Sequence, residues 1–169
     1  ENTSKLIKQL RAQGKANNIG FSSILMGWTW DSRSGRNPSD WFKAGIWDFA
    51  GIDAYGEGEG TTSYMQTNGM AAARLFYGAP ERNLKIAVGE WGIRNQKHTE
   101  TAAGEIPTAQ EQQDALTRFN SAYNGALASA TDGKGSQVIG LSYFDSNLNS
   151  PNGSWELSYL QLPRFRELI

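Results

Sequence analysis

The sequence predicts an α/β protein built on a parallel β-sheet, and two observations support this fold class. Apolar segments with strand character alternate with segments of helical periodicity, and the strand-like segments lie at residues 19–26, 49–53, 85–91 and 137–142. Parallel strands require such helical crossovers. Each strand-like segment also ends in aromatic and polar residues, as expected where the carboxyl ends of parallel strands form a functional edge. A doubly wound sheet and a barrel both fit this alternation.

Length and composition place the chain among globular proteins and limit its chemistry. Its 169 residues fit one domain, and a hydrophobic content of 38% supports a sizeable core. The net charge is −1 with acids and bases interspersed, so neither a nucleic acid nor a membrane surface is an expected partner. There is no cysteine and one histidine, His98, which excludes thiolate nucleophiles and multi-histidine metal centres. Carboxylates, aromatic rings and amides are the groups left for chemistry.

The first half of the chain reads as helix, strand, short turn and strand. Apolar residues recur at helical spacing from a start at Thr3 or Ser4, and Gly14 supplies a stop. The strand at 19–26 leads into aromatic and acidic residues at 27–31 and then a polar loop. A short packed helix or turn at 41–47 precedes the second strand, which delivers Asp53 and Tyr55 to its end.

The second half continues the alternation. The glycines at 56–60 are interleaved with two glutamates that would repel phosphate, so a nucleotide-binding loop is rejected. A helix from Thr61 or Thr62 through residue 77 follows, then the strand at 85–91. Thr108 and Glu111 form a capping box for a long helix, with one apolar face made by Leu116, Phe119, Tyr123 and Leu127. The last strand and a helix starting at 162–163 complete the pattern.

Residues 85–92 contain the strongest candidate for a functional carboxylate. An apolar strand ends in Glu90, which is flanked by Gly89 and Trp91 and followed by Gly92. The glycines relieve crowding where a side chain leaves the sheet to meet a ligand, and the tryptophan offers a flat apolar wall. The alternative is a structural glutamate that caps a helix or pairs with Arg94.

Sugar-binding sites combine aromatic plates with amides and carboxylates, and the strand ends supply both kinds of group. The candidate aromatic contacts are Trp28, Trp30, Trp91, Tyr143 and Phe144. The alternative for each ring is a place in the core. Asp31, Asp53 and Asp145 are further carboxylates at strand ends, and such aspartates bind hydroxyls or organise loops.

Taken together, these motifs resemble the carboxyl-terminal half, strands five to eight, of a clan A glycoside hydrolase (β/α)8 barrel, in the endo-mannanase-like and related bacterial or phage glycosidase families. The four matching strand ends lie at residues 27–31, 51–55, 88–92 and 141–145 and span nearly the whole chain. The resemblance implies that Glu90 is the catalytic nucleophile of a retaining enzyme and that Tyr55 hydrogen-bonds it. It also implies an aromatic floor from Tyr143 or Phe144, where many relatives have tryptophan. A full barrel needs about 250 residues, so residues 1–169 form a single half-barrel segment.

The chain departs from this family at the general acid/base, a glutamate expected after the fourth strand. Glu1 and Asn2 have the right residue types in the wrong order, ahead of a helix, so Glu1 is not assigned the role. We expect a second chain, or an amino-terminal half from the same gene, to supply it. No cofactor and no metal are expected. The calcium-loop spacing of residues 145–156 has Ser150 in place of the turn glycine.

Two functions follow from these residues. The first is a retaining glycosidase acting on β-linked polysaccharide or glycan. The second is a non-catalytic carbohydrate-binding or structural module, for instance in a surface or virion assembly, because fold does not imply function. In both, Ile24 and Leu25 on the first strand and Ile139 and Leu141 on the last are expected to pair with strands outside this chain and to form a large apolar seam with them.

Overall fold

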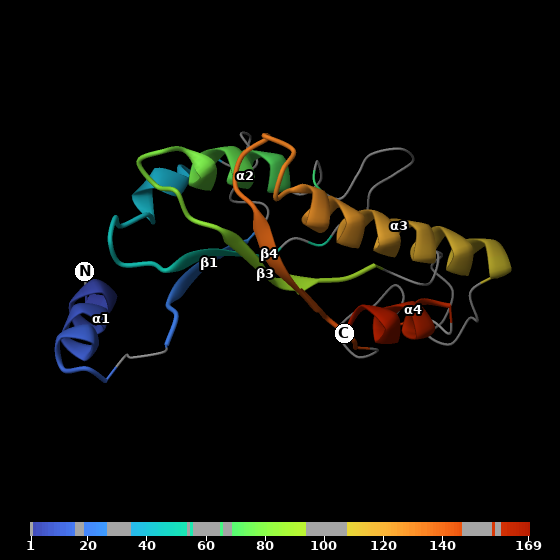
Figure 1. The fold of residues 1–169 in the computed structure, drawn as a ribbon, viewed down its shortest axis with the longest axis horizontal. Coiled ribbons are helices and arrows are strands. Elements are labelled where there is room, and N and C mark those ends of the chain that lie inside the picture. Colours follow the sequence, from blue (N-terminus) through green and yellow to red (C-terminus); the bar gives the residue numbers. More distant parts are fainter. Residues whose placement is uncertain are drawn as a thin grey trace.

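The structure is a computed structural model that describes residues 2–15, 19–26, 35–53, 55, 65, 69–93, 108–146, 157 and 160–169, with only the backbone for 25 and 26. Its centre is a four-stranded sheet in which every neighbouring pair is parallel and the strand order follows the chain (Figure 1). The strands are β1 (Ser22–Met26), β2 (Phe49–Asp53), β3 (Ile86–Trp91) and β4 (Val138–Tyr143). The predicted parallel α/β sheet is therefore confirmed.

The described helices are α1 (Asn2–Ala12), α2 (Met70–Gly78), α3 (Ala109–Ala128) and α4 (Gln161–Leu168), with a short 3-10 turn, η3, at Pro38–Asp40. Helices α2 and α3 lie on one face of the sheet (Figure 1). The described helix α2 begins at Met70, after Gly69, which has a left-handed backbone with φ 77°. The predicted start at 61–62 lies outside the described residues. No helix in the described ranges is long and apolar enough to cross a membrane.

Helix α3 begins with the predicted capping box. The Thr108 hydroxyl accepts from the Glu111 backbone at 3.2 Å, and the Glu111 carboxylate accepts from the Thr108 backbone at 2.8 Å. Its buried face is shifted from the predicted one and consists of Gln112, Ala115, Phe119 and Ala122. Leu127, at the last turn, is 60% exposed and lies beside an apolar cavity next to β4.

The hydrophobic core lies between the sheet and these helices. Alternate strand residues point to opposite faces, and the side chains that meet α2 and α3 are Ala50 and Ile52, Ile86 and Val88, and Val138. These core side chains define an outer, helix-covered side of the sheet. Strands β1 and β4 are the two edges of the described sheet.

A buried arginine links α2 to the segment between α3 and β4. Arg74 is 2% exposed, and its guanidinium donates to the Asp132 carboxylate at 2.6 and 2.9 Å and to the Ser136 carbonyl at 2.8 Å. This fork geometry satisfies both carboxylate oxygens at once. It therefore secures the connection that delivers β4 to the edge of the sheet.

Candidate active site

The carboxyl ends of β2 and β3 bring two acidic side chains side by side. Asp53 and Glu90 are partners in the β2–β3 register, although the preceding pair is Ile52 with Val88. Strand β3 therefore contains a bulge here, and Gly89 is its extra residue, without a partner in the β2 register. A bulge re-aims side chains at the end of a sheet, and here it places both carboxylates at the same level of the same edge.

Glu90 is held by a tyrosine from the neighbouring strand end. The Tyr55 hydroxyl donates to Glu90 Oε2 at 2.7 Å, a distance typical of a charge-assisted hydrogen bond. Partial burial raises the pKa of Tyr55, and the hydrogen bond and negative charge of Glu90 raise it further. The phenol therefore stays protonated and remains a donor over the ordinary pH range.

Asp53 lies against the glycine between the two strands. Burial raises the pKa of Asp53, and the negative charge of Glu90 raises it further. A hydrogen bond from the Glu90 backbone lowers this pKa, but by less. A Cβ atom added to Gly89 would lie 2.9 Å from Asp53 Oδ1. Gly89 is thus needed for space rather than for an unusual backbone angle, and it lets the Asp53 carboxyl fit beside β3.

Phe144 provides an aromatic ring next to the Tyr55–Glu90 pair. Its ring meets that of Tyr55 edge to face, with centroids 6.1 Å apart and planes at 85°. Its backbone N–H donates to the Trp91 carbonyl at 2.8 Å, which continues the β3–β4 pairing past the end of β4. Of the two aromatic residues expected after the last strand, Phe144 is therefore the one near Glu90.

Trp91 and Tyr143, which were expected to face a ligand at this edge, pack against Phe119 of α3. Trp91 is 2% exposed, and its ring packs against Phe119 of α3 at 5.4 Å and against Tyr143 at 5.1 Å. The Tyr143 hydroxyl donates to the Ile93 carbonyl at 3.3 Å, and burial raises the pKa of Tyr143 to about 12. Both rings lie on the helix-covered side. Consecutive strand residues point to opposite faces, so Trp91 must face the helices if Glu90 does not.

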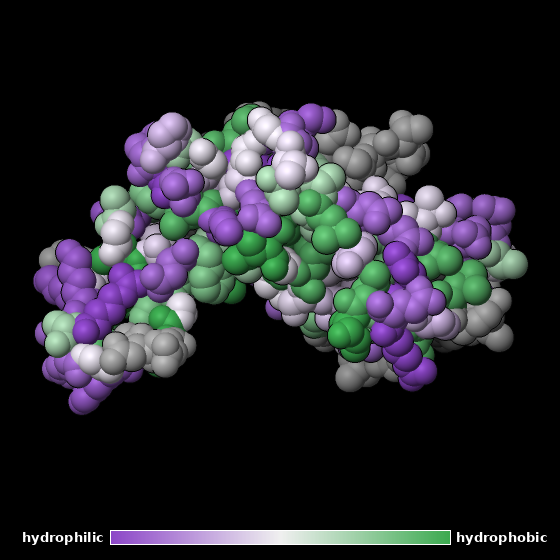
Figure 2. Space-filling model, viewed as in Figure 1, coloured by the Kyte–Doolittle hydropathy of each residue, from purple (hydrophilic) through white to green (hydrophobic). Residues whose placement is uncertain are grey.

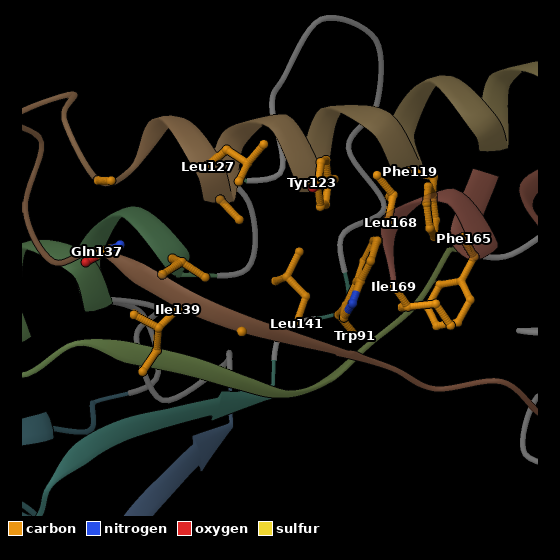
Figure 3. Close-up of a pocket in the computed structure, with 14 residues that line it drawn as sticks. Trp91, Phe119, Tyr123, Leu127, Gln137, Ile139, Leu141, Phe165, Leu168 and Ile169 are labelled. Carbon is orange, nitrogen blue, oxygen red and sulfur yellow. The ribbon is translucent and has the colours of Figure 1, made fainter.

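Trp91 instead lines an apolar cavity of about 400 Å³ between α3, β4 and α4 (Figure 3). Figure 3 shows Trp91 and Leu141 directed from the sheet toward α3, with Phe119 and Phe165 near one end of the space. The wall residues are mostly aliphatic or aromatic, and no aspartate or glutamate is among them. This cavity lies on the other side of the sheet from the carboxylates and is separate from the candidate site.

The remaining expected site residues are only partly described. Asp145 is exposed, and its Oδ1 accepts from the Leu157 backbone at 3.0 Å, so it holds Leu157 near the end of β4. Trp28, Trp30 and Asp31 lie outside the described residues, as do His98 and residues 147–156 of the calcium-like spacing. Across the described ranges, no group of three or more histidine or acidic side chains is arranged to hold a metal ion.

Comparison with known proteins gives a likeness of fold. No protein-family model and no curated protein sequence matches the chain. A solved structure does match: a β-glucosidase from Exiguobacterium marinum, with a TM-score of 0.52 and 13% sequence identity. The match covers 92% of this chain and 50% of the β-glucosidase chain. In fold, the chain is similar to half of a β-glucosidase.

The geometry defines what this edge of the sheet can do. It presents a carboxylate whose orientation is held by a phenol, a second carboxyl group that retains its proton to higher pH than usual, and an aromatic ring beside them. The register bulge was not predicted from the sequence, although a glycine inside a strand pattern is a known sign of one. Such a group of residues suits attack by a carboxylate on an electrophilic carbon of a hydroxyl-rich ligand.

Proposed function

We propose that this chain is the carboxyl-terminal half of a retaining β-glycosidase barrel that acts on a β-linked polysaccharide or glycan, with Glu90 as nucleophile. The observation that carries the proposal is the hydrogen bond from Tyr55 to Glu90 across adjacent parallel strand ends. The fold likeness to half of a β-glucosidase supports it. A carboxylate serving only as a helix cap or an ion-pair partner would not need an orienting phenol from the next strand.

The reaction divides into two displacements at the anomeric carbon. A Glu90 oxygen bonds to that carbon as the bond to the leaving oxygen breaks, which gives a glycosyl ester. A second carboxyl group, about 5 to 5.5 Å from the first, gives its proton to the leaving oxygen. It then takes a proton from the water that attacks the same carbon and releases Glu90. In this proposal the second group comes from the amino-terminal half of the barrel.

The other described residues act on the nucleophile or the sugar. Tyr55 fixes the direction of the Glu90 carboxylate through Oε2, and Oε1 is the oxygen that attacks. Phe144 is placed to pack against the apolar face of a sugar ring. Asp53, whose carboxyl keeps its proton to higher pH, binds a sugar hydroxyl beside the nucleophile.

The test is Glu90→Gln in a protein that includes both barrel halves. Turnover of β-linked oligosaccharides should fall by several orders of magnitude while sugar binding is retained, because the amide keeps the shape but cannot form the ester. Glu81→Gln, at an exposed acid between α2 and β3, is the matched control and should leave turnover unchanged. A 2-fluoro glycoside should label the Glu90 peptide, as detected by mass spectrometry.

Near-normal turnover of Glu90→Gln, or labelling elsewhere, removes Glu90 from the mechanism. A parent assembly that binds β-linked oligosaccharides and hydrolyses none would support the second function, a non-catalytic carbohydrate-binding module.

A further inference from the structure

The two acidic side chains at the carboxyl edge of the sheet have different hydrogen-bond partners. Asp53 and Glu90 are opposite each other in the β2–β3 register, and we call them the acid pair. Glu90 accepts from the Tyr55 hydroxyl at 2.7 Å, and a phenol that donates to a carboxylate stabilises its negative charge. The carboxyl of Asp53 instead receives a hydrogen bond from the Glu90 backbone. The negative charge of the acid pair is therefore stabilised mainly on Glu90.

One oxygen of Asp53 lies in apolar surroundings. Asp53 Oδ1 is buried and has no hydrogen-bond partner among the described residues. A Cβ atom added to Gly89 would lie 2.9 Å from this oxygen and 3.5 Å from Ile24 Cδ1, so the oxygen and the isoleucine methyl group meet above the same glycine. A buried carboxylate oxygen without a donor is costly. Protonation of Asp53 removes the charge from this place.

The described neighbours of Asp53 do not offset a second negative charge. On β3 it faces Glu90, and Tyr55 follows it after β2. On β1 its register partner is Met26, and neither this residue nor Ile24 carries a charge. In Figure 2, the middle of the molecule, where Figure 1 shows the sheet, is mostly apolar, and hydrophilic residues gather toward the two ends. Burial and the charge of Glu90 accordingly raise the pKa of Asp53.

Asp53 also contacts the bulge that directs Glu90 out of the sheet. The hydrogen bond from the Glu90 backbone N–H to the Asp53 carboxyl holds the main chain directly after Gly89, the extra residue of the bulge. The carbonyl oxygen of a neutral carboxylic acid can accept this bond, and so can the oxygen of an amide. This contact therefore does not require a charge on Asp53.

We propose that Asp53 is a positioning residue for Glu90 that works as an uncharged carboxylic acid, holding the Glu90 backbone at the bulge and leaving the single negative charge of the acid pair on Glu90. The inference rests on the proposed function for the role of Glu90 as nucleophile, and it goes beyond the contact of Asp53 with a sugar hydroxyl. When Glu90 becomes a glycosyl ester, its negative charge is lost, so Asp53 gives up its proton to water more readily. Hydrolysis of the ester restores the charge of Glu90, and Asp53 takes up a proton again.

The first test compares two substitutions of Asp53 in a protein that includes both barrel halves. Asp53→Ala should lower kcat/KM by about 3- to 10-fold, because the Glu90 N–H loses its acceptor. Asp53→Asn keeps an acceptor oxygen without a charge and should recover most of this loss, to within about twofold of the parent. Asp40→Asn, the same change at an exposed aspartate of η3, is the matched control and should leave kcat/KM unchanged. An asparagine variant as slow as the alanine variant, or no loss in either, overturns the proposal.

The second test measures the charge of Asp53 directly by carbon NMR of the same protein labelled at its aspartate carboxyl groups. The resonance that Asp53→Asn removes belongs to Asp53, and it should titrate above 3.8, the ordinary value of the pKa. Glu90→Gln should move this titration to lower pH, because it removes the neighbouring negative charge. Labelling of Glu90 by a 2-fluoro glycoside should move it in the same direction.

A titration at or below 3.8, or one that Glu90→Gln does not move, overturns the shared charge whatever the activity of the variants. The proposed function can fail independently of this result. If Glu90→Gln moves the titration of Asp53 but the glycoside labels no residue and no sugar is hydrolysed, the chemistry assigned to Glu90 is wrong and the shared charge of the acid pair is supported.

Discussion

Replacing Tyr55 by phenylalanine isolates the hydrogen bond that orients Glu90. The change removes the hydroxyl that donates to Glu90 Oε2 at 2.7 Å and keeps the ring that meets Phe144. A hydrogen bond to a charged group contributes about 1.5–3 kcal/mol. Because Tyr55 is only half-buried, water can replace part of this, and the low end applies. We expect kcat/KM of the two-half enzyme to fall about tenfold, the equivalent of about 1.4 kcal/mol.

The assay is steady-state hydrolysis of a β-linked oligosaccharide, with the thermal midpoint of each variant measured alongside. Tyr77→Phe is the control, because it removes a buried phenol hydroxyl from α2, away from the strand ends. It should change stability without a selective loss of kcat/KM. Unchanged kcat/KM in Tyr55→Phe, or an equal loss in Tyr77→Phe, would refute the assignment of Tyr55 as the residue that positions the nucleophile.

Three further predictions concern the framework and the strand ends. Arg74→Met should lower the free energy of unfolding by about 2–4 kcal/mol in chemical denaturation, because it leaves the Asp132 carboxylate and a buried carbonyl without their donor. Hydrogen bonding from Arg74 lowers the pKa of Asp132 to about 2, so the stability that Asp132 contributes is present above pH 4 and is lost as the pH falls toward 2. Asp132→Asn should make the free energy of unfolding depend less on pH between about 4 and 2, and an unchanged pH dependence would contradict the assignment. Gly89→Ala should cost about 1–3 kcal/mol by thermal melting, since its Cβ would lie 2.9 Å from Asp53 Oδ1, and a neutral result would show that the Asp53 carboxyl has room to move.

The sequence alone was enough to predict the order and type of the main elements. Periodicity, capping residues and glycine stops are local signals, so they identified the four strands and the long helix α3, including the capping box of Thr108 and Glu111. Parallel pairing followed from the alternation of strands and helices, and the carboxyl ends of parallel strands necessarily meet at one edge. That topology brings Glu90 and Tyr55 to the same edge, and the hydrogen bond between them was expected only from the resemblance to glycosidase barrels.

The tertiary structure decided which way side chains at that edge point and which of them touch. Trp91 and Tyr143 are the last residues of β3 and β4, yet both rings pack against α3, because burying large apolar surface against a helix is favourable and the sheet alternates faces. The pairing of Asp53 with Glu90 depends on a bulge, and a bulge is set by how two distant strands fit together. Residue types and spacing along the chain therefore determined that carboxylates and aromatic rings would gather at one edge. Only packing between segments far apart in sequence selected Tyr55, Glu90 and Phe144 as the group in contact.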